Sequence, residues 1–250
     1  MSDQLTRVRD LILWETGAPS TLVVASDNLG GIGSLPRDRY FCPAEDVGYF
    51  TARVVLFELL AAGAAPRLML FNLANAGEYG RLILLGVREA LQEAGMPGDF
   101  PVNGSSEKNV TTDMTALGLT LIGTRGGNFR PGRARAGDRL WLVGRPKSAP
   151  HDRVVRGDAE MCGFDHLHFL SRQPGVHDMV PVGSGGGRPE IDAVARSGGL
   201  QVVTESGFDD LLTRSGGPAT ALVAAVAPEA ASVLAGLGAS VPVWRVGALR

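Results

Sequence analysis

The longest regular pattern in the sequence is the segment 44–62, AEDVGYFTARVVLFELLAA. Its apolar residues recur at spacings of three and four, the repeat of one face of an α-helix: Val47, Phe50, Val54, Phe57 and Leu60. Glu45 and Asp46 come at its start, where acidic side chains suit the positive end of the helix dipole. We therefore predict an amphipathic helix over 44–62.

The segments around this helix predict alternating strands and helices. Short apolar or alternating runs predict strands at 21–25, 67–73, 100–102 and 115–122. A second helix is expected over 79–94, and a weak apolar stripe predicts another helix over 5–14. From residue 21 onward the order is β-α-β-α-β-β, which is typical of a two-layer α/β unit.

The segment 124–138, TRGGNFRPGRARAGD, is rich in glycine, proline and arginine. Such a composition is typical of a boundary, so we predict an N-terminal domain at 1–125 and a C-terminal domain at 138–250. The arginines are interpreted as a solvated linker, with a basic patch as the alternative. Within the C-terminal domain we expect strands at 140–143, 200–203 and 241–246, and helices at 191–196 and 228–237.

Composition excludes several classes of protein. With 44% hydrophobic residues and a formal net charge of −2 over 250 residues, the sequence is typical of a globular protein. It does not predict a disordered chain or one that binds nucleic acid. No apolar run is long enough for a transmembrane helix and no signal-peptide pattern is visible, so we expect a cytoplasmic protein without a membrane partner. The lysines, Lys108 and Lys147, do not complete a P-loop.

Two polar loops carry the residues best suited to chemistry. The first is SDNLGGIG at 26–33 and the second is NGSSEKNVTTD at 103–113, and each follows a predicted strand. Ligands gather beyond the carboxyl ends of strands in α/β sheets. Carboxylates such as Asp27 and Glu107 suit magnesium, and glycines let backbone N–H groups approach an anion. The alternative is that both loops only turn the chain, with Asp27 as a cap.

The second half of the chain offers weaker candidates. The glycine run 183–187, GSGGG, is either a flexible turn or a loop that faces a substrate. His166 and His168 share a face if their segment is a strand, but no third zinc ligand follows at a fixed spacing. The pair His177 and Asp178 is a candidate base for a substrate hydroxyl.

The order of the two loops and the helix between them resembles a known superfamily. "SDNLGGIG", "VGYFTARVVLFELLAAGAAP" and "NGSSEKNVTTDMTALGLTLIG" are similar to the aminoimidazole ribonucleotide synthetase-like (PurM-like) proteins over residues 21–123. The resemblance is weaker over 178–250. It implies an α/β (α+β) fold of two domains, in which the N-terminal sheets of two chains form a dimeric β-barrel and the C-terminal domain is α/β.

Departures from the family patterns narrow the resemblance. The chain lacks the "GTK" of the purine enzyme, an N-terminal selenium-site cysteine, a C-terminal reactive cysteine and the "EGVHF"-like stretch of thiamine monophosphate kinase. What remains is most similar to the α-ribazole kinases of cobalamin salvage. The resemblance implies magnesium- and ATP-dependent phosphorylation of a ribose hydroxyl. The alternatives are another ATP-dependent synthetase or ATPase that acts on a small metabolite, and a nucleotide-binding protein without turnover.

The resemblance also implies roles for residues of both loops. Asp27 and Glu107 would be the catalytic residues that hold the metal, with Asp113 as a further metal ligand. A larger set would contact ATP: Asp27, Asn28, Gly30, Gly31, Ser105, Ser106, Asn109 and Thr112. The expected partners are a small nucleoside substrate and a second copy of the chain.

Overall fold

The computed structural model describes residues 4–17, 20–237 and 239–250. The chain divides into two compact units. Unit 1 comprises residues 1–59 and 64–125, and unit 2 comprises residues 60–63 and 126–250. Within the described residues, no helix is long and apolar enough to cross a membrane.

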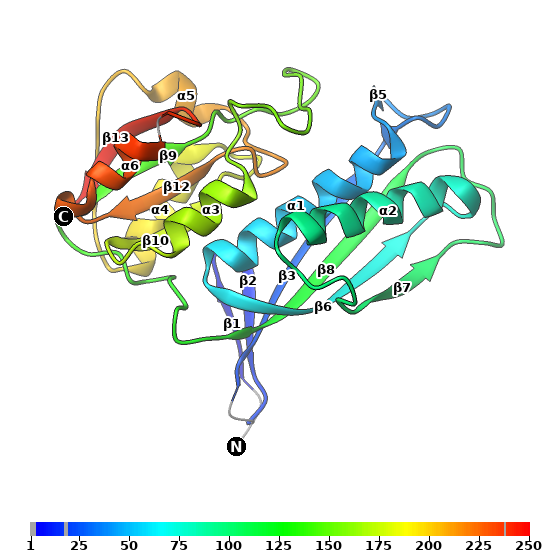
Figure 1. Cartoon of the computed structure of the whole chain (residues 1–250), viewed down its shortest axis with the longest axis horizontal. Coiled ribbons are helices and arrows are strands. Elements are labelled where there is room, and N and C mark those ends of the chain that lie inside the picture. The colour runs from blue at the N-terminus through cyan, green and yellow to red at the C-terminus, as the bar shows by residue number, and fades with distance from the viewer. Residues whose placement is uncertain (1–3, 18–19, 238) are drawn as a thin grey trace. The chain divides into compact units, whose positions relative to one another are not determined.

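Unit 1 is built on a six-stranded sheet in the order β1-β2-β3-β8-β6-β7 (Figure 1). Its strands are β1 (Gln4–Val8), β2 (Leu11–Glu15), β3 (Leu22–Gly30), β6 (Ala64–Leu73), β7 (Val102–Ser106) and β8 (Ala116–Arg125). β6 and β7 are parallel, and the other neighbouring strands are antiparallel. A small parallel pair, β4 (Ile32–Gly33) and β5 (Tyr40–Phe41), lies in the segment after β3.

Two helices, α1 (Ala44–Ala61) and α2 (Gly77–Glu93), cover one face of this sheet (Figure 1). Alternate residues of β8 are buried on that face, among them Leu117, Leu119 and Leu121. The helices cross closely because Gly48 and Gly86 have no side chains: a Cβ at either position would lie 1.8 Å from a carbonyl oxygen of the other helix. Both helices confirm the predictions over 44–62 and 79–94.

The helix predicted over 5–14 is wrong, because this segment forms the hairpin of β1 and β2. The apolar residues match a strand period as well as a helical one. Leu11 and Leu13 are buried, whereas Ile12 and Trp14 are 46% and 39% exposed. Arg9, with φ of 57°, turns the chain between the two strands.

The two predicted loops begin inside strands. The strand predicted at 21–25 continues to Gly30, because β3 pairs with β8 along its whole length. The strand predicted at 100–102 instead runs from Val102 to Ser106, where it pairs with β6. The backbone partners are far away in the sequence, so local composition did not predict this pairing. Asp27 and Ser105 are therefore strand residues.

The sheet face opposite the helices is apolar at one end. Four residues that are cross-strand neighbours form a row there: Ile12, Val24, Ile122 and Leu68. Ile12 is exposed and Val24, Ile122 and Leu68 are partly buried, so none of the described elements of unit 1 covers this row fully. We call these four residues the apolar row.

Unit 2 contains an antiparallel five-stranded sheet in the order β10-β12-β9-β13-β11. Its strands are β9 (Arg139–Val143), β10 (Val176–Pro181), β11 (Val202–Thr204), β12 (Leu222–Val226) and β13 (Val243–Leu249). Its helices are α3 (Phe164–Ser171), α4 (Gly187–Ser197), α5 (Asp209–Thr213), the 3₁₀ turn η1 (Pro228–Ala230) and α6 (Ser232–Leu237). The core includes Leu140, Leu142, Ile191, Val223 and Val246. The predicted strand at 140–143 and helix at 191–196 are confirmed.

Candidate functional site

The two polar loops lie side by side in unit 1. The backbone N–H of Gly31 donates to the carbonyl of Thr115 at 2.9 Å, and that of Arg37 donates to the carbonyl of Asp113 at 2.9 Å. Gly31 adopts φ of +71°, the left-handed conformation that favours glycine. These two bonds join the segment between β3 and α1 to the segment between β7 and β8.

A partly buried hydrogen-bond network built on Asp38 holds the first loop in place. The Asp38 carboxylate accepts from the backbone N–H groups of Leu35 and Thr115, both at 2.8 Å, and from the Thr115 hydroxyl at 2.7 Å. The Tyr79 hydroxyl lies 2.8 Å from Thr115 Oγ1 and accepts from the N–H of Ser34. A Cβ on Gly33 would lie within 2.5 Å of Asp38, Tyr79 and Thr115 side-chain atoms. Sequence reasoning missed Asp38, because nothing local indicates a partner 77 residues away.

Asn75 and Thr112 hold the second loop against the end of β6. Asn75 is buried, and its Nδ2 donates to Thr112 Oγ1 at 2.8 Å and to the carbonyl of Met114 at 3.0 Å. The Thr112 hydroxyl donates to the carbonyl of Ala74 at 2.8 Å. Thr112, proposed from the sequence to contact a nucleotide, therefore has its hydroxyl engaged in fixing the loop.

Asp27 lies in β3, opposite Leu119 of β8, on the face that the helices cover. Its neighbours on this face of the strand are Ala25, which is buried, and Leu29. Burial raises the pKa of the Asp27 carboxyl above its ordinary value, while a hydrogen bond from the Asn28 backbone opposes the rise. A partly desolvated carboxylate interacts strongly with a cation, because the surroundings screen little.

Glu107 follows β7 directly, and its N–H donates to the carbonyl of Leu73. Its Oε1 accepts from the backbone N–H groups of Asn109 at 2.6 Å and Val110 at 3.1 Å. These bonds hold the pKa of Glu107 below its usual range, so the carboxylate is charged at neutral pH. One carboxylate oxygen thus shapes the turn at 107–110.

Polar residues continue across the uncovered face of the sheet. The pairing places Asn28, Gly118, Asn72 and Ser105 in one row across β3, β8, β6 and β7. A Cβ on Gly118 would make only ordinary contact with Asn72, at 3.9 Å, so an alanine would fit between the two asparagines. Ser106 lies in register with Leu73, on the helix-covered side. Asn72 was missed, because its partners come from three separate strands.

The remaining predicted contacts lie at the exposed rim. Gly30, Asn109 and Asp113 are exposed, and Asp113 lies 3.9 Å from the Arg37 guanidinium. In the described part of the chain, no three His, Cys, Asp or Glu side chains converge as a metal site. Asp27, Glu107 and Asp113 thus do not form a ready-made metal cage within one chain.

The histidines of unit 2 differ from the sequence predictions in their secondary structure or in their hydrogen-bond partner. His166 and His168 lie on α3 rather than on a strand, and His166 Nδ1 accepts from the N–H of Gly163. His177 pairs with Asp138 at 2.9 Å, not with the adjacent Asp178. Asp178 is fully buried and accepts from the backbone N–H groups of Gly132 and Met179. A base formed by His177 together with Asp178 is wrong, because His177 is bonded to Asp138 and the Asp178 carboxylate to backbone N–H groups.

No family model matches the sequence, and none of the curated proteins matches it. Solved structures match over nearly the whole chain. Thiamine-monophosphate kinase from Stenotrophomonas maltophilia matches with a TM-score of 0.60 at 19% identity, covering 99% of this chain and 88% of that one. AaThiL complexed with AMPPCP and TMP matches with 0.63 at 14% identity, covering 98% and 86%.

The hydrogenase maturation protein HypE from E. coli matches with a TM-score of 0.65 at 17% identity, covering 91% of this chain and 79% of that one. A further HypE match is a complex with ATP. The chain has a PurM-like fold. At these identities the likeness establishes the arrangement of strands and helices, and the chemistry must be argued from the residues of this chain.

Proposed function

We propose that this protein is a magnesium- and ATP-dependent phosphotransferase that phosphorylates a hydroxyl of a small nucleoside, with α-ribazole as the acceptor. The observation that carries the proposal is the joined pair of loops in unit 1, the unit to which Asp27 and Glu107 both belong. The matches to structures complexed with AMPPCP and with ATP support it.

The donor set of the two loops fits magnesium. Mg²⁺ prefers oxygen ligands, keeps several waters, and is held by one or two carboxylates together with substrate phosphates. Asp27 and Glu107 would supply those carboxylates, with Asp113 at the rim as a further ligand. Two carboxylates are enough for such a site, so a cage of three protein ligands is not required. The bound ion would neutralise charge on the phosphate oxygens.

Backbone and amide groups would position the nucleotide. Gly30 and Gly31 leave the backbone open, since an added Cβ at Gly30 meets nothing within 4 Å. Ser106, which shares the helix-covered side of the sheet with Asp27, and Asn109 at the rim would donate to nucleotide oxygens. Asn28 and Ser105 lie on the uncovered face, so they would contact only a part of the nucleotide that extends to that face. Thr112 would fix the loop through its bond to Ala74. Phosphoryl transfer depends mainly on positioning and charge neutralisation, so this donor set is sufficient without a covalent nucleophile.

In the proposed reaction the acceptor hydroxyl oxygen forms a bond to the γ-phosphorus of ATP as the bond to the β–γ bridging oxygen breaks. ADP leaves and the hydroxyl proton is released. The choice of α-ribazole rests on the resemblance of the loop motifs to the α-ribazole kinases, since the fold alone does not select an acceptor.

The test is an assay of purified protein with MgATP and α-ribazole, with ADP measured by a coupled enzyme and the product by ³¹P NMR. We expect ADP and α-ribazole 5′-phosphate in equal amounts. If ADP forms with thiamine monophosphate but not with α-ribazole, the proposed acceptor is wrong, while the proposed reaction, phosphoryl transfer from ATP, stands. ATP binding without ADP from any acceptor would refute the enzyme and leave a nucleotide-binding protein.

We also propose that two chains associate through the uncovered sheet face of unit 1. The apolar row and the exposed Trp14 and Leu5 support this, because exposed apolar strand faces mark interaction sites. Light scattering at micromolar concentration should give twice the chain mass, and Ile12→Arg should halve it. A monomeric mass for the unaltered chain would contradict the dimer.

A further inference from the structure

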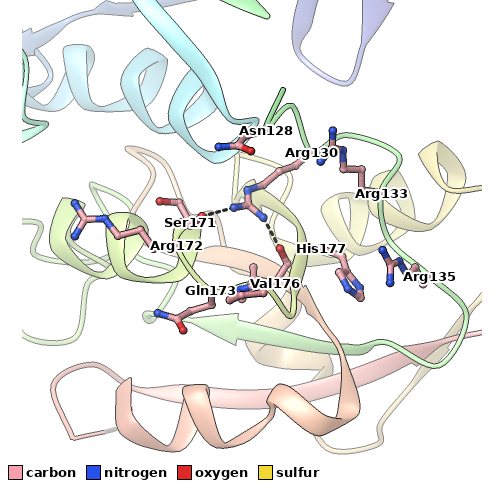
Figure 2. A pocket seen from close by; sticks show the side chains of 10 residues that line it. Asn128, Arg130, Arg133, Arg135, Ser171, Arg172, Gln173, Val176 and His177 are labelled. Carbon is pink, nitrogen blue, oxygen red and sulfur yellow. Dashed lines mark hydrogen bonds between the residues drawn. The ribbon is translucent and has the colours of Figure 1, made fainter. Parts of the chain in front are cut away.

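A hollow of about 810 Å³ lies in unit 2, and all of its lining residues belong to that unit. It is formed by the segment 128–135, the end of α3 and the start of β10 (Figure 2). Its lining includes four arginines and one histidine: Arg130, Arg133, Arg135, Arg172 and His177. In the view of Figure 2, Arg172 lies on one side of Arg130, and Arg133 and Arg135 lie on the other. We call this feature the arginine hollow.

Arg130 forms the fixed part of the arginine hollow. It is 9% exposed, and its guanidinium donates to the carbonyls of Ser171 and Val176 (Figure 2). These bonds tie the end of α3 and the start of β10 to the segment after unit 1. Its buried Nε has no hydrogen-bond partner within the described residues. Arg130 is therefore a buried cation, and one of its N–H donors has no acceptor among the described residues.

Two buried carboxylates hold the arginine-bearing segment by its backbone. Asp178 accepts from the N–H of Gly132 at 3.1 Å, and Asp138 accepts from the N–H of Arg135 at 2.8 Å. Asp138 also binds His177 Nδ1, so Nε2 is the imidazole atom left for another partner. Asp178 and Asp138 thus hold the backbone of the segment 132–135, which lines the hollow.

The outer arginines are not neutralised by carboxylates of the described residues. Within the described residues, no ion pair involves Arg133, Arg135 or Arg172, and the Arg133 side chain donates to the carbonyl of Gly127. All three are exposed residues. Elsewhere in unit 2 arginines do pair with carboxylates, as Arg145 does with Glu160 and Arg214 with Asp152. Three outer cations around one hollow, without carboxylate partners, favour an anionic ligand.

We propose that the arginine hollow is a second anion site, which binds the diphosphate group of a small phosphorylated molecule without a metal ion. Planar guanidinium groups match phosphate oxygens two at a time, and Asn128 and Gln173 add amide donors at the rim. The volume falls within the range of small-ligand sites. A half-open hollow on a chain of net charge −2 fits a compact anion rather than a nucleic-acid strand.

The test is calorimetric titration of the full chain with inorganic pyrophosphate in EDTA, which removes the metal that the site in unit 1 would need. We expect one pyrophosphate per chain, with an affinity that falls as salt rises. Arg133→Gln with Arg172→Gln should weaken binding by about tenfold or more, because each change removes charged hydrogen-bond donors. Arg130 is left intact because it holds backbone carbonyls.

The control is Arg153→Gln with Arg250→Gln, which removes the same charge from exposed positions of unit 2 outside the hollow. It should change the affinity by less than about twofold. Asp27→Asn should bind pyrophosphate as the unaltered chain does, which separates this site from the proposed enzyme site. No binding at millimolar pyrophosphate, equal losses in the two arginine pairs, or loss in Asp27→Asn would each overturn the proposal.

Discussion

The loops of unit 1 and the arginine hollow of unit 2 both suit an anion, but they do so with opposite chemistry. The loops offer carboxylates, glycine backbone and amides, so we expect a phosphate to bind there together with a divalent cation. The hollow offers guanidinium groups over carboxylates that are already bonded to the main chain. From this difference we expect ligand binding in the first region to require a metal and binding in the second to need none.

The largest expected effect comes from Asp27→Asn. Removing the half-buried carboxylate should lower kcat/KM for MgATP by about 10²–10³-fold, the scale for loss of one key electrostatic group. Asp10→Asn is the matched control, since Asp10 is an exposed carboxylate of the same unit. Steady-state ADP formation measures both variants. Equal activity in the two variants would remove Asp27 from the site.

Glu107→Gln separates a role in the metal site from a role in the loop. A glutamine oxygen can still accept from the N–H groups of Asn109 and Val110, so the turn should persist. We expect about 10²-fold lower kcat, a higher magnesium requirement and an unchanged Tm. Full activity would show that Glu107 only shapes the turn.

Gly33→Ala and Gly30→Ala test how the first loop is supported. A Cβ at Gly33 would meet Asp38, Tyr79 and Thr115, whereas a Cβ at Gly30 meets nothing within 4 Å. Gly33→Ala should cost about 1–3 kcal/mol of unfolding free energy, the scale of overpacking. Gly30→Ala should leave stability nearly unchanged and weaken ATP binding. Urea unfolding and nucleotide titration measure the two effects, and equal stability loss in both would contradict the described network.

The smallest effect is a pH dependence in the ligand-free protein. The pKa of Asp27 is raised by burial from its ordinary value of 3.8, so the folded state holds this proton more tightly than the unfolded state does. Ionised Asp27 therefore lowers stability above its folded-state pKa, and the loss vanishes below the ordinary value. Asp27→Asn should thus have a higher Tm than the unaltered chain at pH 7, with the gap closing toward pH 3.5. A lower Tm at pH 7 would show that Asp27 stabilises the fold.

Local patterns predicted the parts of the fold that local interactions decide. The helix over 44–62 ends within one residue of α1, because its period and its acidic first turn lie in one continuous segment. The hairpin of β1 and β2 was missed, because Leu11, Ile12 and Trp14 fit both a helical stripe and strand alternation. Burial by the rest of the sheet decided between the two.

In the candidate site, too, features that depend on local sequence were predicted and features that depend on distant residues were not. The pairing of the two polar loops was anticipated from their order, and the bonds from Gly31 to Thr115 and from Arg37 to Asp113 join the two segments. Asp38, Asn72 and Asn75 could not be predicted, because each acts through partners from strands or loops far along the chain. The arginines at 130–135 were interpreted as a solvated linker. They line a hollow because Arg172 and His177 arrive from about 40 residues later.

The measurement that tests the central claim most directly is titration of AMPPCP into the protein with and without magnesium, for the unaltered chain and for Asp27→Asn. The account predicts one site per chain that strengthens with magnesium, and loss of that strengthening in Asp27→Asn. The double variant Arg133→Gln with Arg172→Gln should still bind AMPPCP more strongly with magnesium than without it. Magnesium-dependent binding that persists without the Asp27 carboxylate would contradict the assignment of the nucleotide site to the loops of unit 1.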